Sequence, residues 1–404
     1  MSADASGAEP RNLLVTQDYA PDLGGMARRH VELCRRYPPG MEVSTVAAPG
    51  AARFDAAEPY AVHRQPFAFA GAKVITNQLR WGQWLVRYAR RAPVVLHCGN
   101  VRPAGYAVWM AHRRTGAPYL VYVNGLDLLI ERRKARSAIK RRTAAAILGA
   151  AAGVVANSRW TADVAAEVMR EVGVRHPPPV AAIDLGTDPA QFTPARDTGT
   201  LRRRLGLGDA PVLLTVARLV PHKGHDVAIE ALARLGGGSD ARYLVVGAGP
   251  DEARLRALAA ARGLAGRVVL TGALPDAEVA EAYATADVYV GLSRLDGPTS
   301  VEGFGISFVE AAASGTPSVA GDSGGVRSAV RDGETGFVVP PLDPDAAAAA
   351  LRRLLDDAAL RAAMGARGRR LVETHYNWER VARETADFAR RAVAGRARPA
   401  TRTT

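Results

Sequence analysis

Short runs of branched aliphatic residues alternate with alanine-rich, amphipathic stretches along almost the whole chain. This alternation is typical of repeated strand–helix units, in which helices cover both faces of a parallel sheet. In the first half it predicts strands at 12–16, 42–47, 94–97, 119–123, 153–156 and 180–184. It predicts helices at 26–36, 72–91, 104–114, 129–151 and 159–172. The first half is therefore expected to form an α/β domain around a parallel sheet.

The pattern is interrupted between residues 186 and 199, where Pro189, Pro194 and Gly199 disfavour regular structure, and then begins again. Strands follow at 212–216, 243–246, 268–271, 288–291, 317–320 and 336–338. The expected fold class is α/β, with two Rossmann-like, doubly wound parallel-sheet domains at 1–188 and 189–375 that face each other across a cleft. A C-terminal helix in 376–404 is expected to pack back on the first domain, with a disordered tail after Gly395.

The composition fits a globular enzyme and sets limits on its surroundings. The 404 residues are 48% apolar and 23% charged, and no apolar run approaches the roughly 20 residues of a membrane-spanning helix. Two cysteines and a polar, acidic N-terminus without a signal-peptide pattern predict a cytoplasmic protein. The formal net charge of +13 points to a polyanionic partner, although a general preference for arginine in the sequence is the alternative explanation.

Two loops that follow predicted strands carry residues suited to a phosphate ligand. Gly24 and Gly25 open a predicted helix whose first N–H groups could meet an anion, although a tight turn explains the two glycines equally well. Arg218 and Lys223 follow the strand at 212–216 and could grip a diphosphate, arginine as a fork and lysine as a point charge. Because only four of the 53 cationic residues are lysines, Lys223 indicates a position for which arginine has the wrong shape. A solvated surface loop is the alternative.

A third segment, from Glu302 to Glu310, places two carboxylates around a glycine-rich turn that becomes a helix. Gly303 and Gly305 can expose N–H groups, and Glu310, about one turn into the helix, can accept hydrogen bonds from vicinal hydroxyls such as those of ribose. A helix cap with one exposed glutamate would need no ligand. The Arg–Lys pair upstream, at the matching edge of the sheet, favours a binding site.

These segments, taken in order along the chain, resemble the large family of retaining glycosyltransferases with the GT-B fold, of the family 4 or group 1 type. The resemblance covers residues 12 to about 394 and rests on Gly24-Gly25, 157–160, 186–188 with Phe192 and Pro194, Arg218 with Lys223-Gly224, 246–250 and 302–310. Residues 301–306 and 321–325 look most like the phosphatidylinositol mannosyltransferase-like branch, which uses GDP-mannose. The resemblance implies an enzyme that needs no metal or cofactor and transfers a hexose from GDP-mannose or a UDP-sugar to a lipid, glycan or small-molecule acceptor.

The resemblance also implies roles for individual residues. Arg218 and Lys223 would bind the donor diphosphate and stabilise the departing nucleotide, and Glu310 would hold the donor ribose. Glu302 would hold the transferred sugar. Backbone and apolar contacts to the donor would come from Gly24, Gly25, Gly247, Leu274, Gly303, Phe304, Gly305 and Ile306.

One position departs from the pattern of the family. After the strand at 119–123 many relatives carry His-Gly, with the histidine close to the donor sugar, whereas this chain has Asn124-Gly125. Asparagine can hydrogen-bond a sugar hydroxyl but cannot take up a proton. Asn124 is therefore expected to contribute to catalysis through binding and not as a general base.

A basic run in the first half predicts a surface for an anionic lipid or a phosphorylated acceptor. On a single helix over 129–151, Arg132, Arg133, Arg136 and Lys140 would line one face, with Leu129, Ile130 and Ile139 turned inward. Trp81 and Trp84 could add interfacial anchors for peripheral contact with the inner face of the membrane. The alternative is a solvated helix face with both tryptophans in the core. No nucleic-acid partner is expected, because the basic runs lack interleaved aromatic residues.

Other motifs and functions carry less weight. Gly247-Ala-Gly249-Pro250 lacks the third glycine of a dinucleotide fingerprint. Asp343-Pro-Asp345 fits a manganese-binding pattern but directly precedes an alanine-rich helix, so helix capping is predicted and no metal ligands are assigned. A nucleotide-sugar epimerase or hydrolase on the same scaffold, or a non-catalytic membrane-binding homologue, are the competing functions.

Overall fold

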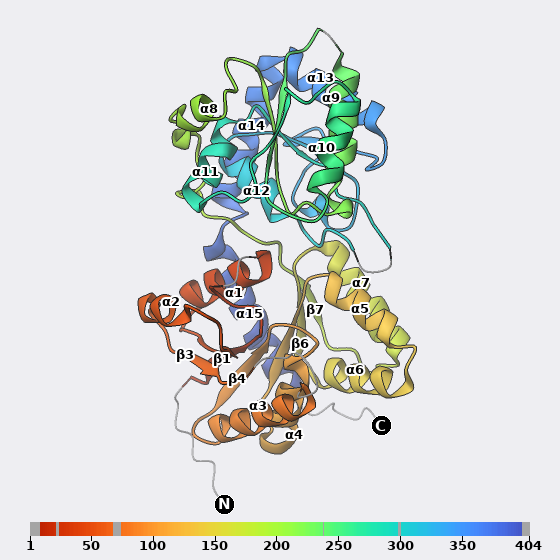
Figure 1. Cartoon of the computed structure of the whole chain (residues 1–404). Coiled ribbons are helices and arrows are strands. Elements are labelled where there is room, and N and C mark those ends of the chain that lie inside the picture. The colour runs from red at the N-terminus through yellow and green to blue at the C-terminus, as the bar shows by residue number, and fades with distance from the viewer. Residues whose placement is uncertain (1–8, 22–23, 68–73, 237, 298–299, 398–404) are drawn as a thin grey trace, which may run out of the picture. The chain divides into compact units, whose positions relative to one another are not determined.

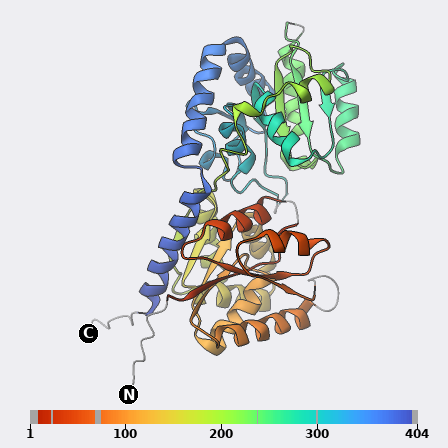
Figure 2. The same ribbon diagram turned by 90° about the vertical axis from the view of Figure 1, so that its left-hand side faces the viewer.

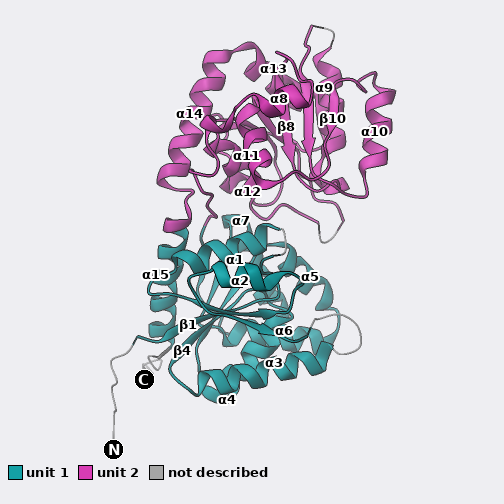
Figure 3. Cartoon of the chain, turned by 60° about the vertical axis from the view of Figure 1, so that its left-hand side comes forward, with its two compact units in different colours: residues 1–183, 381–404 teal, residues 184–380 magenta. Residues whose placement is uncertain are grey.

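The computed structural model describes residues 9–21, 24–67, 74–236, 238–297 and 300–397 (Figure 1). The chain forms two compact units, shown in different colours in Figure 3. Unit 1 comprises residues 1–183 and 381–404, and unit 2 comprises residues 184–380. Residues 398–404 of the predicted disordered tail lie outside the described residues.

Unit 1 is built on a seven-stranded parallel sheet with the strand order β3-β2-β1-β4-β5-β6-β7. Its strands are β1 Arg11–Val15, β2 Glu42–Val46, β3 Val62–Gln65, β4 Val94–Cys98, β5 Tyr119–Val123, β6 Gly153–Ala156 and β7 Val180–Ala182. The six strands predicted from the sequence are confirmed to within two residues at their ends. β3 was not predicted, because its sequence Val-His-Arg-Gln lacks an apolar run.

Helices cover both faces of this sheet, as expected for a buried parallel sheet. They are α1 Gly25–Arg36, α2 Ala51–Ala57, α3 Val74–Ala89, α4 Ala104–Thr115, α5 Leu126–Lys134, α6 Ala138–Ala150, α7 Arg159–Val172 and most of α15 Trp378–Ala397. Figure 2 shows α1 and α2 on one side of the strands and α3 on the other. Most of α15 lies on the α1 side, where its Phe388 comes so close to Gly153 of β6 that a Cβ there would overlap the phenyl ring.

The single helix predicted over 129–151 is wrong. The segment forms two helices, α5 and α6, which are separated by a turn at residues 135–137. Residues 131–138, Glu-Arg-Arg-Lys-Ala-Arg-Ser-Ala, offer no large apolar side chain that could hold one continuous helix against the sheet. Charge periodicity alone was therefore a poor guide to helix continuity here.

Unit 2 repeats the architecture on a six-stranded parallel sheet with the order β10-β9-β8-β11-β12-β13. Its strands are β8 Val212–Val216, β9 Arg242–Val246, β10 Val268–Leu270, β11 Val288–Gly291, β12 Ser318–Gly321 and β13 Gly336–Val339. Its helices are α8 Thr200–Arg204, α9 His225–Leu235, α10 Glu252–Ala261, α11 Asp276–Thr285, α12 Ile306–Ala313, α13 Pro344–Asp356 and α14 Ala358–Thr374. The helices α9, α10 and α13 pack together on one face, and α8, α11, α12 and α14 on the other.

Both units are therefore doubly wound, and the predicted α/β class with two parallel sheets is confirmed. In each sheet the order of the strands reverses once, between β1 and β4 in unit 1 and between β8 and β11 in unit 2. Ligands of doubly wound sheets bind beyond the carboxyl ends of the strands at such a reversal. Within the described part of the chain, no helix combines the length and the apolarity that crossing a bilayer requires.

Candidate active site

The carboxyl edge of unit 2 joins the loops that follow β8 and β11, the two strands at the reversal. The backbone N–H of Arg294, after β11, donates to the carbonyl oxygen of His222, after β8, over 2.8 Å. The guanidinium of Arg294 also donates to both oxygens of Asp226, at 2.7 and 3.0 Å. This backbone bond and bidentate ion pair hold the two loops together as one surface.

The structure brings two of the predicted site residues into direct contact. Nζ of Lys223 donates to Oε2 of Glu302 over 2.7 Å, and both side chains are partly buried. Arg218, at the start of the same loop, is exposed, and its guanidinium makes no hydrogen bond or salt bridge with the described residues. Burial and the nearby Lys223 lower the pKa of His222, so the histidine adds no charge at neutral pH. One compensated and one uncompensated cation thus lie on the β8 loop.

Glycines allow the loops of this edge to approach one another closely. Gly224 has φ +73°, and a Cβ at this position would overlap the carbonyl oxygen of Leu292, so alanine is disfavoured by conformation and by space. Gly247, after β9, has φ +142° and lies equally close to the carbonyl of Ala217. Its N–H already donates to the carbonyl oxygen of Gly272 over 2.9 Å, so a donor contact of Gly247 would have to use another atom. Leu274 lies half-buried in the next loop, after β10.

The predicted glycine-rich turn forms the start of α12. Gly305 precedes the helix with φ +93°, and the carbonyl oxygen of Glu302 accepts a 2.8 Å hydrogen bond from the N–H of Gly325. Among the described residues, the N–H groups of Phe304, Gly305, Ile306 and Ser307 meet no acceptor. The side chain of Phe304 is buried, so a ligand could touch this residue only through its backbone. Four N–H groups at a helix N-terminus suit an oxygen-rich or anionic ligand.

Glu310 lies deeper than a surface glutamate would. The residue is 5% exposed, and Oε2 accepts a 2.7 Å hydrogen bond from the hydroxyl of Tyr283 on α11. The alternative of an exposed glutamate in a helix cap therefore does not describe this residue. Tyr283 was not found from the sequence, because a tyrosine 27 positions away in another helix leaves no local signal.

In unit 1 the predicted residue Asn124 follows β5 at the carboxyl edge. Its backbone N–H donates to Oδ1 of Asp127 over 2.9 Å, and its side-chain oxygen accepts a 2.7 Å hydrogen bond from Arg29 on α1. Gly24 and Gly25 form the start of α1, and among the described residues beyond its chain neighbours none lies within 4 Å of a Cβ built on Gly24. Residues 22 and 23 of this first loop lie outside the described residues.

The predicted basic surface differs from the structure in three respects. Arg132 is held by Glu167 at 2.7 Å and Glu171 at 2.9 Å, so its charge is compensated. Ile139, which was expected to face inward, is 75% exposed, because α6 begins a new helix after the turn. Trp81 is fully buried and donates a 2.9 Å hydrogen bond to Ser44, so its assignment as an interfacial anchor is wrong.

The rest of the basic run stays available to solvent. Arg133, Arg136 and Lys140 are exposed around Ile139, together with Arg141 and Arg142. Trp84 is partly buried and stacks on Tyr88, with 5.2 Å between the ring centroids. The prediction of a basic contact surface is therefore reduced to the start of α6 and the end of α5.

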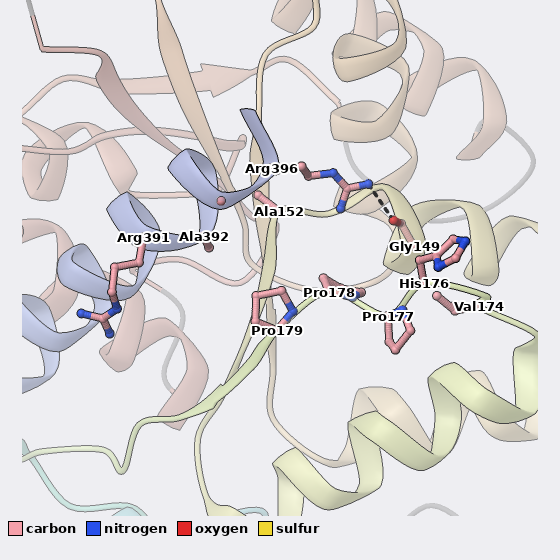
Figure 4. A pocket seen from close by; sticks show the side chains of 11 residues that line it. Gly149, Ala152, Val174, His176, Pro177, Pro178, Pro179, Arg391, Ala392 and Arg396 are labelled. Atoms are coloured by element: carbon pink, nitrogen blue, oxygen red, sulfur yellow. Dashed lines mark hydrogen bonds between the residues drawn. The ribbon is translucent and has the colours of Figure 1, made fainter. Parts of the chain in front are cut away.

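Two other features lie away from these edges. Asp343 caps α13 by accepting hydrogen bonds from the N–H groups of Asp345 and Ala346, at 3.0 and 2.9 Å, so the capping interpretation is confirmed. In the described residues, no group of three or more His, Cys, Asp or Glu side chains could hold a metal ion. A cavity of about 550 Å³ in unit 1 lies near the amino ends of β6 and β7, where Arg396 donates to the carbonyl oxygen of Gly149 over 2.9 Å (Figure 4). No predicted site residue lines it.

Two protein-family models match the chain, one for each half. The model described as "Glycosyltransferase Family 4" matches residues 23–189, and the model described as "Glycosyl transferases group 1" matches residues 197–371. The second match contains Arg218, Lys223 and the whole turn from Glu302 to Glu310. Together the two matches include both carboxyl edges described above.

Curated proteins similar to this chain are also glycosyltransferases. The GDP-mannose-dependent alpha-(1-6)-phosphatidylinositol monomannoside mannosyltransferase of Mycolicibacterium smegmatis is 39% identical over 242 residues, which are 59% of this chain and 62% of that enzyme. The alpha-D-kanosaminyltransferase of Streptomyces kanamyceticus is 30% identical over 307 residues, which are 73% of this chain and 77% of that enzyme. The mannosyltransferase matches are shorter than two thirds of those enzymes, so activity and substrates do not follow from them directly.

Solved structures share the fold of the whole chain. HepE of Anabaena, solved with UDP, superposes with a TM-score of 0.76 at 19% identity, covering 93% of this chain and 98% of that one. Sucrose-phosphate synthase of Thermosynechococcus elongatus gives a TM-score of 0.77 at 24% identity, covering 96% and 100%. The predicted GT-B architecture is thereby confirmed. With both family models and the kanosaminyltransferase match in agreement, this chain belongs to the group 1 glycosyltransferases, with an N-terminal half of the family 4 type.

Proposed function

We propose that the chain is a retaining, metal-independent glycosyltransferase that takes a hexose from a nucleotide-diphosphate sugar bound by unit 2. One observation carries this proposal: an exposed Arg218, a partly buried Lys223–Glu302 pair and four N–H groups that meet no acceptor among the described residues lie on loops at the strand reversal of unit 2. A pyrophosphate has the charge that the two cations match, and a sugar has the hydroxyls that Glu302 and the N–H groups match.

The charges of this edge account for the chemistry that the proposal requires. Negative charge develops on the diphosphate as its bond to the sugar breaks, and fixed cations stabilise that charge without rearranging during the reaction. Arg218 and Lys223 would perform this electrostatic task, which divalent metal ions perform in other enzymes. Glu302 orients Lys223 and would accept hydrogen bonds from the sugar.

Retention of configuration would follow if the acceptor hydroxyl attacks on the face that the diphosphate leaves. A phosphate oxygen of the departing diphosphate would then take the proton of that hydroxyl. Asn124 cannot take the proton, so within this proposal its role is binding.

The relatives suggest the donor, and the basic surface suggests the acceptor. GDP-mannose is the donor in the printed name of the Mycolicibacterium enzyme, and UDP is the ligand of the Anabaena structure, so both nucleotides belong in a first screen. Arg133, Arg136 and Lys140 around the exposed Ile139 support peripheral contact with an anionic membrane and an anionic lipid or phosphorylated acceptor. A glycan or small-molecule acceptor is compatible with the same donor site in unit 2.

Thermal-shift screening against GDP-mannose, UDP-glucose and UDP-N-acetylglucosamine tests the donor assignment. A donor at a hundred times its dissociation constant adds about 2.7 kcal/mol to the free energy of unfolding. Lys223→Ala and Glu310→Ala should each abolish the shift. Arg262→Ala removes an exposed cation at the C-terminal end of α10 and should keep the thermal shift. If the first two variants shift like the parent, the donor site is wrongly placed.

Turnover separates this proposal from its two competitors. A transferase converts the donor only when an acceptor is present and forms a product with the donor's anomeric configuration, which ¹H NMR can read. Donor consumption without an acceptor would identify a hydrolase or epimerase. A thermal shift without turnover on any acceptor would identify a non-catalytic homologue.

A further inference from the structure

Arg29 on α1 is a buried cation that makes no salt bridge with the described residues, although the nearby carboxyl group of Asp127 acts on it to raise its pKa. Arg29 is 2% exposed, and its guanidinium carbon lies 5.0 Å from the ring centroid of Tyr122. Burial lowers the pKa of Arg29 to about 10, so the side chain still carries its charge at neutral pH. Nε is buried and has no hydrogen-bond partner among the described residues. An apolar side chain of similar length would fill this space without the desolvation cost of a cation, so packing alone does not account for the arginine.

The hydrogen bond of Arg29 fixes the side-chain amide of Asn124. A guanidinium can only donate, so the amide must turn its oxygen toward Arg29, and the 2.7 Å distance agrees with this orientation. The amide nitrogen then lies on the other side, 3.4 Å from the sulfur of Met26, a residue that is 36% exposed. Asp127 holds the backbone N–H of Asn124 at 2.9 Å. Both the backbone and the side chain of Asn124 are thus held in place.

The neighbours of Arg29 leave Asn124 as its one side-chain acceptor in the described structure. The hydroxyl of Tyr122 is 2.8 Å from Nδ1 of His97, and the other ring nitrogen of His97 lies 3.1 Å from Oδ1 of Asn12. These contacts direct the Tyr122 hydroxyl away from the guanidinium. The cation–amide bond is therefore not shared with another side chain.

We propose that Arg29 is a positioning residue: by holding Oδ1 of Asn124 it presents the amide NH₂ to the substrate, so that this edge of unit 1 recognises a hydrogen-bond acceptor. The ligand group would be an oxygen of a hydroxyl or of a phosphate on the acceptor substrate. This inference rests on the proposed transferase function for its kinetic readout but not for its structural one.

A double-mutant cycle tests whether Arg29 acts through Asn124. Arg29→Met keeps the volume and removes the donor, and it should lower kcat/KM for the acceptor substrate about tenfold, with the nucleotide-sugar dissociation constant unchanged. In an Asn124→Ala background the same substitution should change kcat/KM less than twofold, because no amide is left to orient. Arg29→Lys, which restores a cationic donor, should recover part of the activity. Equal losses in both backgrounds would overturn the proposal.

Asn124→Asp provides the second variant, which does not require removal of the buried cation. Aspartate pairs with Arg29 but presents an acceptor where the amide presents a donor, so kcat/KM should fall at least tenfold while the melting temperature stays at or above that of the parent. Parental activity in this variant would contradict the inferred role.

The orientation itself can be measured without turnover. The ¹⁵N side-chain amide signals of Asn124, identified by their loss in Asn124→Ala, should form one pair in the parent and should shift or double in Arg29→Met. Unchanged signals would show that Arg29 does not set the orientation. If the parent transfers no sugar but these signals behave as expected, the proposed function fails and the positioning by Arg29 stands.

Discussion

The carboxyl edges of the two units use charge in opposite ways. In unit 2, Lys223 and Glu302 pair across two loops while Arg218 projects into solvent, so a cation remains for an external anion. In unit 1, the cation Arg29 is buried and acts on a neutral amide, and the neighbouring histidines are held neutral by burial. The comparison supports the proposal that unit 2 binds its ligand by neutralising charge, whereas unit 1 binds by directed hydrogen bonds.

The largest effect is expected for Lys223→Ala. If Lys223 stabilises the leaving diphosphate as proposed, loss of this fixed cation should lower kcat/KM by about 100- to 1,000-fold, or roughly 3 to 4 kcal/mol, in a steady-state transfer assay. Arg262→Ala serves as the control and should stay within about twofold of the parent, because its partner Glu230 lies in an exposed pair. Equal rates for Lys223→Ala and the parent would remove the contrast between the two edges.

Glu302→Gln should separate sugar binding from diphosphate binding. The substitution keeps the size of the side chain but removes the charge that Lys223 now meets at 2.7 Å. Calorimetry should show GDP or UDP bound at least as tightly as by the parent, since Lys223 is no longer neutralised. The turnover number should fall by about 10- to 100-fold, as expected for a lost charge-assisted hydrogen bond. Weaker nucleotide binding would mean that Glu302 supports the cation instead of the sugar.

Gly224→Ala should show how much unit 2 depends on its two loops lying in contact. Alanine must adopt φ +73° and must also push away the carbonyl of Leu292, so the free energy of unfolding should fall by about 1 to 3 kcal/mol. Gly263→Ala is the matched control, since Gly263 has φ +69° but open space around its Cβ position. Urea titrations of both variants measure the difference, and equal losses would show that overlap with Leu292 contributes nothing.

His97→Gln should weaken the pH dependence of the free energy of unfolding, because His97 is held neutral in the interior of unit 1. Burial lowers the pKa of His97 from 6.5 to about 3. Below pH 6.5 the unfolded chain therefore binds a proton at this histidine that the folded unit does not bind. The contribution of His97 to the free energy of unfolding is complete above pH 6.5 and falls as the pH drops toward 3, by up to about 1.4 kcal/mol per pH unit. Glutamine should remove this part of the slope. Because His30 has a pKa lowered to about 4 and contributes with the same sign, the effect is the difference between parent and variant in urea titrations from pH 4 to 7. Identical slopes would contradict it.

The sequence predicted what is encoded in contiguous segments. Fully buried strands such as Tyr119–Val123 are visible in the sequence as apolar runs, and the glycines and charges around Lys223 and Glu302 form recognisable motifs. The fold and the loops at the carboxyl edge of unit 2 could therefore be predicted. Contacts between distant positions were not. The pair Arg29–Asn124 spans 95 positions and Tyr283–Glu310 spans 27, and no periodicity marks either pair.

Helix continuity and burial were the other failures of prediction. The basic run around Arg136 has a helical charge spacing, but with no apolar face to bury it breaks into α5 and α6 and leaves Ile139 outside. The strand Val62–Gln65 is defined by its parallel pairing with β2 and not by its own residues, since its side chains are mostly polar. In both cases tertiary contacts decided the structure that local composition left open.

The affinity for the bare nucleoside diphosphate tests most directly whether unit 2 binds by neutralising charge. Isothermal titration of GDP and UDP into the parent and into Arg218→Ala/Lys223→Ala, with unfolding curves to confirm an intact fold, isolates the two cations from the sugar and from unit 1. If the two cations hold the diphosphate, the parent should bind both nucleotides, and the affinity of the double variant should be at least about 100-fold lower, or about 2.7 kcal/mol. A folded double variant that binds the nucleotide as tightly as the parent would contradict it.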